Sequence, residues 1–138
     1  MQQFLVLEDK NIEPSEFARL MGAAGYGREG DYDKDVIERS LAAYPFVAYA
    51  QNDQGQLLGY VSAFSDGAFS TFIGELVVRP DAEDAGIGPE LLRRVERRYP
   101  GIPIYAHAFA EEQSFFIRNG YRVARRPMTV LFKQARSH

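Results

Sequence analysis

The segment IGELVVRPDAEDAGIGPELL, Ile73–Leu92, predicts a strand, a tight turn and the beginning of a helix. Ile73–Val78 is β-branched and apolar, as is typical of a buried strand. Gly86 and Gly88 allow the backbone of the turn to approach a ligand closely. The φ of Pro89 suits a first helical position, so we expect the helix to begin there. A helix N-terminus after such a turn favours phosphate, although the same spacing also fits an ordinary strand–helix connection.

The composition indicates an ordinary globular protein. The chain has 138 residues, 46% of them apolar, and a net charge of −3, so no global basic field favours nucleic acid or an anionic membrane. It has no cysteine and two histidines, which excludes a thiolate nucleophile and argues against a metal site. Because the sequence has neither a signal-like N-terminus nor an apolar run of membrane length, a cytoplasmic location is expected.

Helical spacing of apolar residues predicts two helices before the central segment, one beginning at Pro14 and one ending at Pro45. Asp31, Asp33 and Asp35 are alternative caps of the second helix. The apolar faces comprise Phe17, Leu20 and Met21 in the first helix, and Val36, Ile37, Leu41 and Tyr44 in the second.

The remaining elements are mostly strands. Asn52–Gly55 has the composition of a hairpin turn, so three central strands should form an antiparallel meander. A short helix is predicted over Glu111–Asn119, with Gly120 just after its end. The predicted strands are Phe4–Leu7, Phe46–Ala50, Leu57–Phe64, Phe69–Val78, Ile102–Ala108, Tyr121–Ala124 and Thr129–Phe132.

The order of these elements predicts an α+β fold of three layers, in which helices flank a mixed, mostly antiparallel sheet. Residues 1–138 are expected to form a single domain. The order lacks the repeated strand–helix–strand units of a doubly wound dinucleotide fold, which excludes that class.

The chain resembles the GNAT (GCN5-related) N-acyltransferases in this order of elements and in several motifs. The resemblance implies transfer of an acetyl group from acetyl-CoA to an amine of a small molecule or peptide. It also implies a sheet whose central strands splay apart. The motifs are Gly25-Tyr26-Gly27, Ser65-Asp66-Gly67, Glu75-Leu76-Val77-Val78, Gly86-Ile87-Gly88 and Phe115-Phe116-x-x-x-Gly120-Tyr121.

The resemblance further implies where acetyl-CoA would bind. The pantetheine arm would pair with the backbone of Leu76, Val77 and Val78, and Phe116 would lie beside the thiol. The pyrophosphate would bind the backbone amides of the turn. The turn residues are Glu83, Asp84, Ala85, Gly86, Ile87, Gly88 and Pro89.

The turn is degenerate relative to the family pattern. Glu83 and Asp84 bring negative charge near phosphate, and Pro89 removes one N–H donor. Phe116 replaces a tyrosine that protonates the departing thiolate in many family members, and a phenylalanine has no proton to give. We therefore expect acetyl-CoA to bind more weakly than in members with a basic turn.

Glu75 is the candidate catalytic residue. Its apolar neighbours would desolvate the carboxylate, which suits a general base that takes a proton from the incoming ammonium directly or through water. The alternative is a carboxylate that faces solvent or pairs with an arginine. His107 alternates with other side chains in a predicted strand, and a lone histidine there is more often structural than catalytic.

Two further groups of residues are candidates for contact with a ligand. The helix face of Arg93, Arg94, Arg97 and Arg98 could attract phosphate, but a solvated face with Glu90 paired to Arg94 is the favoured interpretation. A mixed aromatic and acidic set suits a cationic acceptor amine. This set, the candidate acceptor wall, comprises Tyr26, Phe64, Asp66 and Phe69.

Three functions remain open on the sequence alone. The first is an acetyl-CoA-dependent N-acetyltransferase, for which a homodimer is not excluded. The second is a GNAT-fold protein that binds acyl-CoA weakly or not at all and acts through protein contacts. The third is an unrelated α+β domain whose glycine turn is structural. Acetyl-CoA-dependent thermal stabilisation separates the first from the third, and turnover separates the first from the second.

Overall fold

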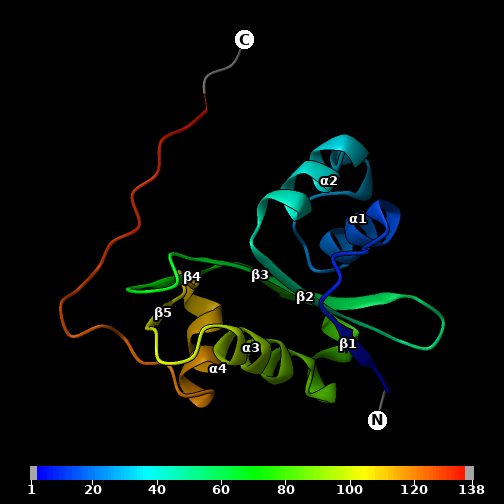
Figure 1. Ribbon diagram of the computed structural model, residues 1–138. Coiled ribbons are helices and arrows are strands. Elements are labelled where there is room, and N and C mark those ends of the chain that lie inside the picture. Colours follow the sequence, from blue (N-terminus) through cyan, green and yellow to red (C-terminus); the bar gives the residue numbers. More distant parts are fainter. Residues whose placement is uncertain (1–2, 136–138) are drawn as a thin grey trace. The chain divides into compact units, whose positions relative to one another are not determined.

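The computed structural model describes residues 3–135, which form two compact units (Figure 1). The first ends at Ala106 and the second begins at His107. No helix within the described residues is long and apolar enough to cross a membrane.

The first unit contains a mixed five-stranded sheet, which confirms the predicted fold class. The strands β1 to β4 pair in sequence order as an antiparallel sheet, and β5 pairs with β4 in parallel. The predicted hairpin and meander are therefore correct. The strands are β1 (Leu5–Leu7), β2 (Phe46–Gln51), β3 (Leu57–Ser65), β4 (Thr71–Val78) and β5 (Ile104–Tyr105).

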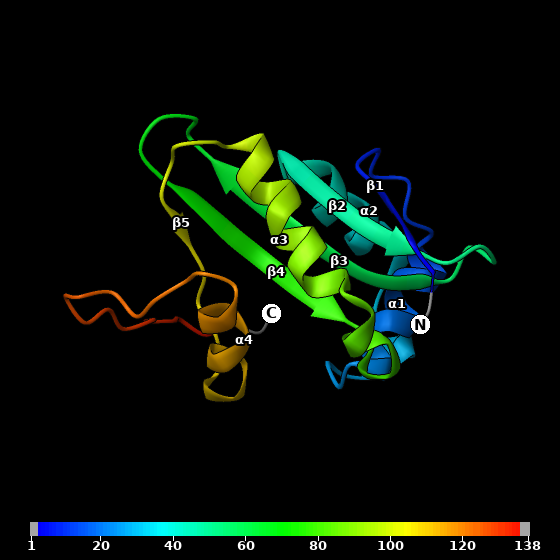
Figure 2. The same cartoon turned by 90° about the horizontal axis from the view of Figure 1, so that it is seen from below.

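Helices cover both faces of this sheet (Figure 2). On one face lie α1 (Pro14–Ala23) and α2 (Lys34–Ala43), whose apolar residues share a core with Tyr60 and Val77 of the sheet. On the other face lies α3 (Ile87–Arg98), which buries Ile87, Leu91, Leu92 and Val95. Burial of these two amphipathic faces supplies the main driving force for the fold.

Local sequence explains the beginning of α2. Asp33, one of the three predicted caps, accepts a hydrogen bond from the Asp35 backbone N–H at 2.8 Å. A short 3₁₀ helix, η1 (Glu29–Asp31), precedes α2.

The apolar face predicted for α2 was wrong at Val36, which is 54% exposed. Only Ile37 and Leu41 of α2 are buried, because the helix presents a narrow stripe to the core.

The connection after β4 is longer than a tight turn. Pro80–Ala85 forms a 3₁₀ helix, η2, and Gly86 follows with a φ of 87°, which favours glycine. The α3 helix begins at Ile87, so the predicted start at Pro89 was wrong by two residues. Pro89 is still tolerated because it lies in the first turn, where an N–H has no intrahelical partner.

The second unit is helical at its beginning. It contains a 3₁₀ helix, η3 (Ala110–Glu112), and α4 (Gln113–Arg118). Gly120 has a φ of 93° and the Tyr121 N–H bonds to the Phe116 carbonyl, so the predicted helix end is confirmed.

Three predicted strands need correction. The strand expected over Ile102–Ala108 is limited to Ile104–Tyr105. The two closing strands, Tyr121–Ala124 and Thr129–Phe132, are not strands in the described part of the chain. Their β-branched and aromatic residues have strand propensity, but propensity without ladder partners does not make a strand.

Candidate active site

A β-bulge in β4 decides which side chains share a face of the sheet. Ser62 pairs with Glu75 and Ala63 pairs with Ile73, so Gly74 is an extra residue on β4. Strict alternation would place Phe72 and Glu75 on opposite faces. The extra residue brings both onto the face that α1 and α2 cover, because a bulge shifts the register by one.

Glu75 is held at this bulge by two groups from β3. The Tyr60 hydroxyl donates a hydrogen bond to the Glu75 carboxylate. The Glu75 backbone N–H donates to the hydroxyl of Ser62, at 3.0 Å, and Ser62 is fully buried. The Glu75 side chain itself is half-buried. Its carboxylate is therefore oriented by the protein but still reachable from solvent.

Tyrosines surround this carboxylate. Burial, and then the charge of Glu75, raises the pKa of Tyr60 well above its ordinary value of 10. The same two causes raise the pKa of Tyr32. The Phe17 ring makes edge contacts with both phenols, at centroid distances of 5.1 Å to Tyr60 and 6.0 Å to Tyr32. Both hydroxyls thus stay protonated at neutral pH, and Tyr60 remains a hydrogen-bond donor.

Tyr44, at the end of α2, lies directly over the bulge. A Cβ added to Gly74 would be 2.5 Å from the Tyr44 hydroxyl oxygen and 2.6 Å from a ring carbon. Real atoms do not approach this closely, so only glycine fits beneath the ring. The position of the Tyr44 ring therefore requires glycine at residue 74 of the bulge.

A row of aromatic rings continues from Tyr44 across three strands. The Tyr44 and Phe64 centroids are 6.4 Å apart. Phe72 stacks between Phe64 and Tyr105, with centroid distances of 5.4 Å on each side and interplanar angles of 20° and 24°. We call Phe64, Phe72 and Tyr105 the ring row.

The edge of β4 beyond Phe72 has no ladder partner on the β5 side among residues 3–135. β5 pairs only with Thr71 and Phe72. The expected divergence of these two strands agrees with this short ladder. Leu76 and Val78 are half-buried, and the Val77 side chain is buried in the core. An extended ligand arm can bond to such an unpaired edge.

The turn that follows presents both amides and carboxylates. Glu83, Asp84 and Gly86 are exposed, Ala85 and Pro89 are half-buried, and Ile87 and Gly88 are buried. Ile87 packs against Gly59 of β3, where an added Cβ would be 3.0 Å from an Ile87 methyl. This contact fixes the N-terminus of α3 against the sheet. The unpaired N–H groups of its first turn favour an anion, while the exposed carboxylates oppose one.

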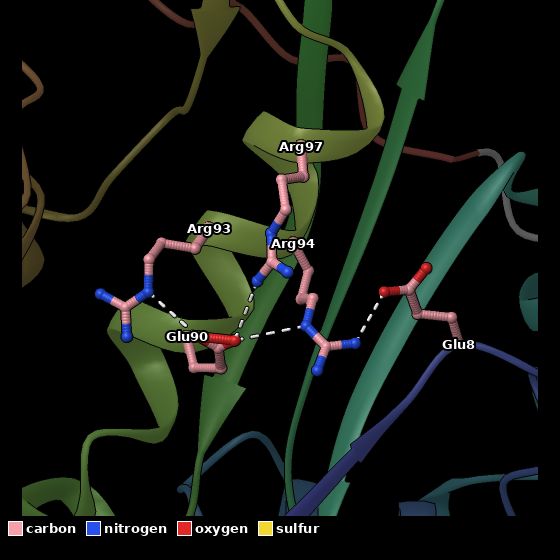
Figure 3. A network of polar contacts seen from close by, with 5 residues as sticks. All are labelled: Glu8, Glu90, Arg93, Arg94 and Arg97. Carbon is pink, nitrogen blue, oxygen red and sulfur yellow. Dashed lines mark hydrogen bonds and ion pairs between the residues drawn. The ribbon is translucent and has the colours of Figure 1, made fainter.

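The arginines of α3 form an ion-pair network (Figure 3). The Glu90 carboxylate accepts from Arg93, Arg94 and Arg97 at 3.0, 3.3 and 3.2 Å. Arg94 also reaches Glu8, next to β1, at 2.8 Å. The guanidinium of Arg98 lies 5.0 Å from the centroid of the Tyr99 ring. The predicted pairing of Glu90 with Arg94 is thus confirmed, and Glu90 pairs more widely than predicted.

The candidate acceptor wall is only partly brought together. Phe64 belongs to the ring row, whereas Phe69 is 82% exposed in the turn between β3 and β4. One Asp66 oxygen accepts the backbone N–H groups of Ala68, Phe69 and Ser70, which lowers the pKa of Asp66. Asp66 therefore holds the turn.

Tyr26, the remaining member of the candidate acceptor wall, lies beside Tyr32. The Tyr26 carbonyl accepts a hydrogen bond from the Tyr32 hydroxyl. Tyr32 also lines an open hollow of about 540 Å³ beside the beginning of α1. Tyr32 therefore contacts Tyr26 and also lines this hollow.

The predicted site residue Phe116 and the histidine His107, which was expected to be structural, lie in the second unit. Phe116 is half-buried, and its ring makes edge contacts with Phe115 and Tyr121 at 5.3 and 5.4 Å. His107 opens this unit. A role for Phe116 beside the thiol stays a prediction.

Sequence reasoning missed the groups that orient Glu75. Tyr60 and Ser62 lie on a different strand, and Tyr44 lies at a helix end. Alternation within Leu57–Ser65 places Tyr60 and Ser62 on one face, but only the bulged register assigns them to Glu75. No group of three or more His, Asp or Glu side chains that could hold a metal occurs within residues 3–135.

Comparison with known proteins identifies the fold. Residues 42–123, well over half of the chain, match the family model described as acetyltransferase (GNAT) domain. Over 112 residues the chain is 27% identical to GCN5-related N-acetyltransferase 3, chloroplastic, of Arabidopsis thaliana. This alignment covers 79% of the chain and 46% of that relative, so the chain spans about half the length of the curated relative it matches.

Solved structures agree with the family match. A GNAT family acetyltransferase of Streptococcus pneumoniae superposes with a TM-score of 0.74 at 16% identity, covering 98% of this chain and 100% of the other. An aminoglycoside N-acetyltransferase solved in complex with CoA gives a TM-score of 0.71 at 17% identity, with 99% and 97% covered. At these identities the likeness shows the fold.

Proposed function

The chain belongs to the GNAT acetyltransferase family, and on that premise we propose that it transfers an acetyl group from acetyl-CoA to an amine of a small molecule or peptide. The observation that carries the proposal is the half-buried Glu75 carboxylate, oriented by Tyr60 at the bulge of β4. The family match runs across the boundary between the two units, which supports a single acyltransferase domain over residues 1–138.

Glu75 acts as the general base in this proposal. An ammonium ion has no lone pair, so it must lose a proton before its nitrogen attacks the thioester carbonyl. Glu75 accepts that proton directly or through one water. The new C–N bond forms, the C–S bond breaks, and the CoA thiolate leaves with the electron pair. The amide nitrogen gives up its second proton to water or to the departed thiolate. A thiolate is stable enough in water to leave without being protonated by the protein first.

The co-substrate site combines the unpaired edge of β4 with the beginning of α3. Leu76, Val77 and Val78 offer backbone groups to the pantetheine arm. The backbone amides of Ile87 and Gly88, in the first turn of α3, offer donors to the pyrophosphate, and Pro89 offers none. The amides of Glu83, Asp84 and Ala85 lie within the 3₁₀ helix η2. An aminoglycoside N-acetyltransferase of the same fold was solved in complex with CoA, which supports CoA as the general class of co-substrate.

The first experiment measures the melting temperature with and without acetyl-CoA. Ligand binding to the folded state alone raises it, and binding at 100 times Kd contributes about 2.7 kcal/mol. A second measurement follows free-thiol release with a panel of primary amines. Stabilisation together with amine-dependent thiol release supports the proposal. Acetyl-CoA binding without turnover of any amine would favour a protein that acts through protein contacts.

The acidic turn gives that alternative a specific basis. Glu83 and Asp84 are exposed next to the proposed pyrophosphate site, where their charge opposes phosphate. Because they are exposed, solvent and salt screen this repulsion, and the expected effect is weaker binding rather than none.

A further inference from the structure

Lys10, in the loop between β1 and α1, has a backbone conformation that lysine rarely adopts. Its φ is 63°, and no other residue except glycine has a positive φ within residues 3–135. A side chain makes this left-handed conformation unfavourable, so it persists only where the surrounding contacts hold it. Strained residues of this kind cluster at functional sites. The contacts of Lys10 therefore indicate what its conformation serves.

The loop is anchored on both sides of Lys10. The Asp9 carboxylate accepts hydrogen bonds from the Tyr49 hydroxyl at 2.6 Å and from the Asn11 backbone N–H at 2.9 Å. The Ile12 backbone N–H donates to the Lys10 carbonyl at 2.9 Å, and the Ile12 side chain is buried in the core. These anchors tie the loop to β2 and to the core, and they fix the backbone from which the Lys10 side chain extends.

The Lys10 ammonium caps the end of α2. It donates a hydrogen bond to the Tyr44 carbonyl and lies 3.5 Å from the carbonyl oxygen of Ala42. The last carbonyls of a helix lack intrahelical donors and lie at the negative end of its dipole, so a cation is favourable there. The Tyr44 backbone N–H donates to the Ser40 carbonyl at 3.3 Å. Both backbone polar groups of Tyr44 are therefore bonded, which restrains the position of its side chain.

Tyr44 links Lys10 to the candidate active site. Its ring lies over Gly74, where an added Cβ would be 2.5 Å from the Tyr44 hydroxyl oxygen. Gly74 is the extra residue of the bulge and directly precedes Glu75. Burial, then the charge of Glu75 and then that of Tyr44 raise the pKa of Tyr60, so the Tyr44 hydroxyl lies near the Tyr60–Glu75 pair. The Tyr44 ring therefore covers the backbone from which the Glu75 side chain extends.

We propose that Lys10 is a positioning residue, which holds the Tyr44 ring over Gly74 and thereby keeps the Glu75 carboxylate in place to accept a proton from the amine. This inference rests on the proposed function, in which Glu75 is the general base. Lys10 takes no part in bond making. Without its ammonium the Tyr44 carbonyl bonds to water, and the ring and the bulge beneath it gain alternative positions. A small displacement of a reacting group is enough to slow catalysis.

The first test is a stability measurement that needs no turnover. Melting temperatures are compared for Gly74→Ala in wild type, in Lys10→Met and in Lys34→Met. The added Cβ forces the Tyr44 ring aside, and a ring that Lys10 no longer restrains moves more readily. We therefore expect Gly74→Ala to lower the melting temperature of Lys10→Met by about half as much as that of wild type. Lys34→Met is the matched control and should show the full decrease, because Lys34 pairs with Glu38 at the beginning of the same helix.

Lys10→Gly repeats this test in a variant that lacks the ammonium but adopts a positive φ without strain. It replaces Lys10→Met if that variant does not fold. Equal decreases in wild type and in both Lys10 variants would overturn the inference, because Lys10 would then not restrain the ring.

The second test is kinetic and uses an amine that wild type acetylates. Lys10→Met should lower kcat by about three- to tenfold, the scale of one lost hydrogen bond, and leave KM for acetyl-CoA unchanged. Lys10→Arg should recover most of the loss, because a guanidinium can donate to the same carbonyls. In Tyr44→Ala, Lys10→Met should cause no further loss, since Lys10 acts through the Tyr44 ring.

The two tests separate this inference from the proposed function. An additional loss of kcat when Lys10→Met is combined with Tyr44→Ala would overturn the inference and leave the acetyltransferase in place. Coupling of Lys10 to Gly74 in the melting temperatures, with no turnover of any amine by wild type, would support the restraint of Tyr44 by Lys10 and contradict acetyl transfer.

Discussion

The Tyr60 hydroxyl on β3 donates a hydrogen bond to the Glu75 carboxylate on β4, and the bulge at Gly74 keeps that carboxylate on the face of α1 and α2. Burial and the negative charge of Glu75 raise the pKa of Tyr60 above 10. Tyr60 therefore donates this bond throughout pH 6 to 9, and the carboxylate is held in one orientation wherever activity would be assayed.

We predict that Tyr60→Phe lowers kcat/KM by about three- to tenfold, because a hydrogen bond to a charged group orients Glu75 and water replaces it only in part. Steady-state kinetics at saturating acetyl-CoA, with the amine concentration varied, measures the change. Tyr49→Phe is the matched control, since Tyr49 lies in β2 of the same sheet and its hydroxyl donates a hydrogen bond to a different carboxylate, that of Asp9. If both variants lose the same small amount of activity, Tyr60 does not position the base.

Gly74→Ala should destabilise the fold by about 1–3 kcal/mol, because its Cβ would overlap the Tyr44 ring. Chemical denaturation measures the free energy of unfolding. In a Tyr44→Ala background the cost should largely disappear, since the space is then free. An equal cost in both backgrounds would show that the glycine is needed for its backbone and not for the Tyr44 contact.

Glu83→Gln should tighten acetyl-CoA binding by about twofold at low salt, because it removes an exposed negative charge next to the proposed phosphate site. Calorimetry at two salt concentrations measures Kd, and the gain should shrink as salt increases. Asp53→Asn, in the β2–β3 turn, is the control, because it makes the same change in net charge outside the segment that contains Glu83. Unchanged or weaker binding in Glu83→Gln would place Glu83 away from the ligand.

Glu90→Gln should lower the melting temperature by about 2–4 °C at pH 7. It removes the carboxylate that pairs with Arg93, Arg94 and Arg97, and we take these ion pairs to contribute about 1 kcal/mol to the free energy of unfolding. Burial opposes the shift, but hydrogen bonds from Arg93 and Arg94 lower the pKa of Glu90 below its ordinary 4.5. This stabilisation is therefore present above pH 4.5 and is lost as pH falls through the lowered value. Thermal unfolding from pH 7 to pH 3 measures it. A gap that does not narrow in acid would contradict an ionic origin.

Much of the fold could be predicted because its signals are local. The Asn52–Gly55 turn indicated the hairpin, and the apolar spacing in α1 indicated that Phe17, Leu20 and Met21 are buried. The two closing strands failed for the opposite reason. Their propensity is local, but a strand is defined by its partner, which propensity does not supply.

The site was predictable only as far as single residues. Glu75 could be selected as a carboxylate within an apolar strand, but Tyr60 and Ser62 contact it only because Gly74 shifts the register. A bulge is invisible to a strict alternation of faces. The ring row depends on the same shift, since without it Phe72 and Glu75 would lie on opposite faces.

The central claim is that Glu75 accepts the proton of the incoming ammonium. The most direct measurement is kcat/KM of wild type and Glu75→Gln across pH 6 to 9, with acetyl-CoA binding measured in parallel. We predict a loss of about 100-fold at pH 7, the usual scale for a general base, which shrinks towards pH 9 as free amine becomes abundant. Equal activity of the two proteins across this range, with acetyl-CoA binding intact, would remove Glu75 from the mechanism.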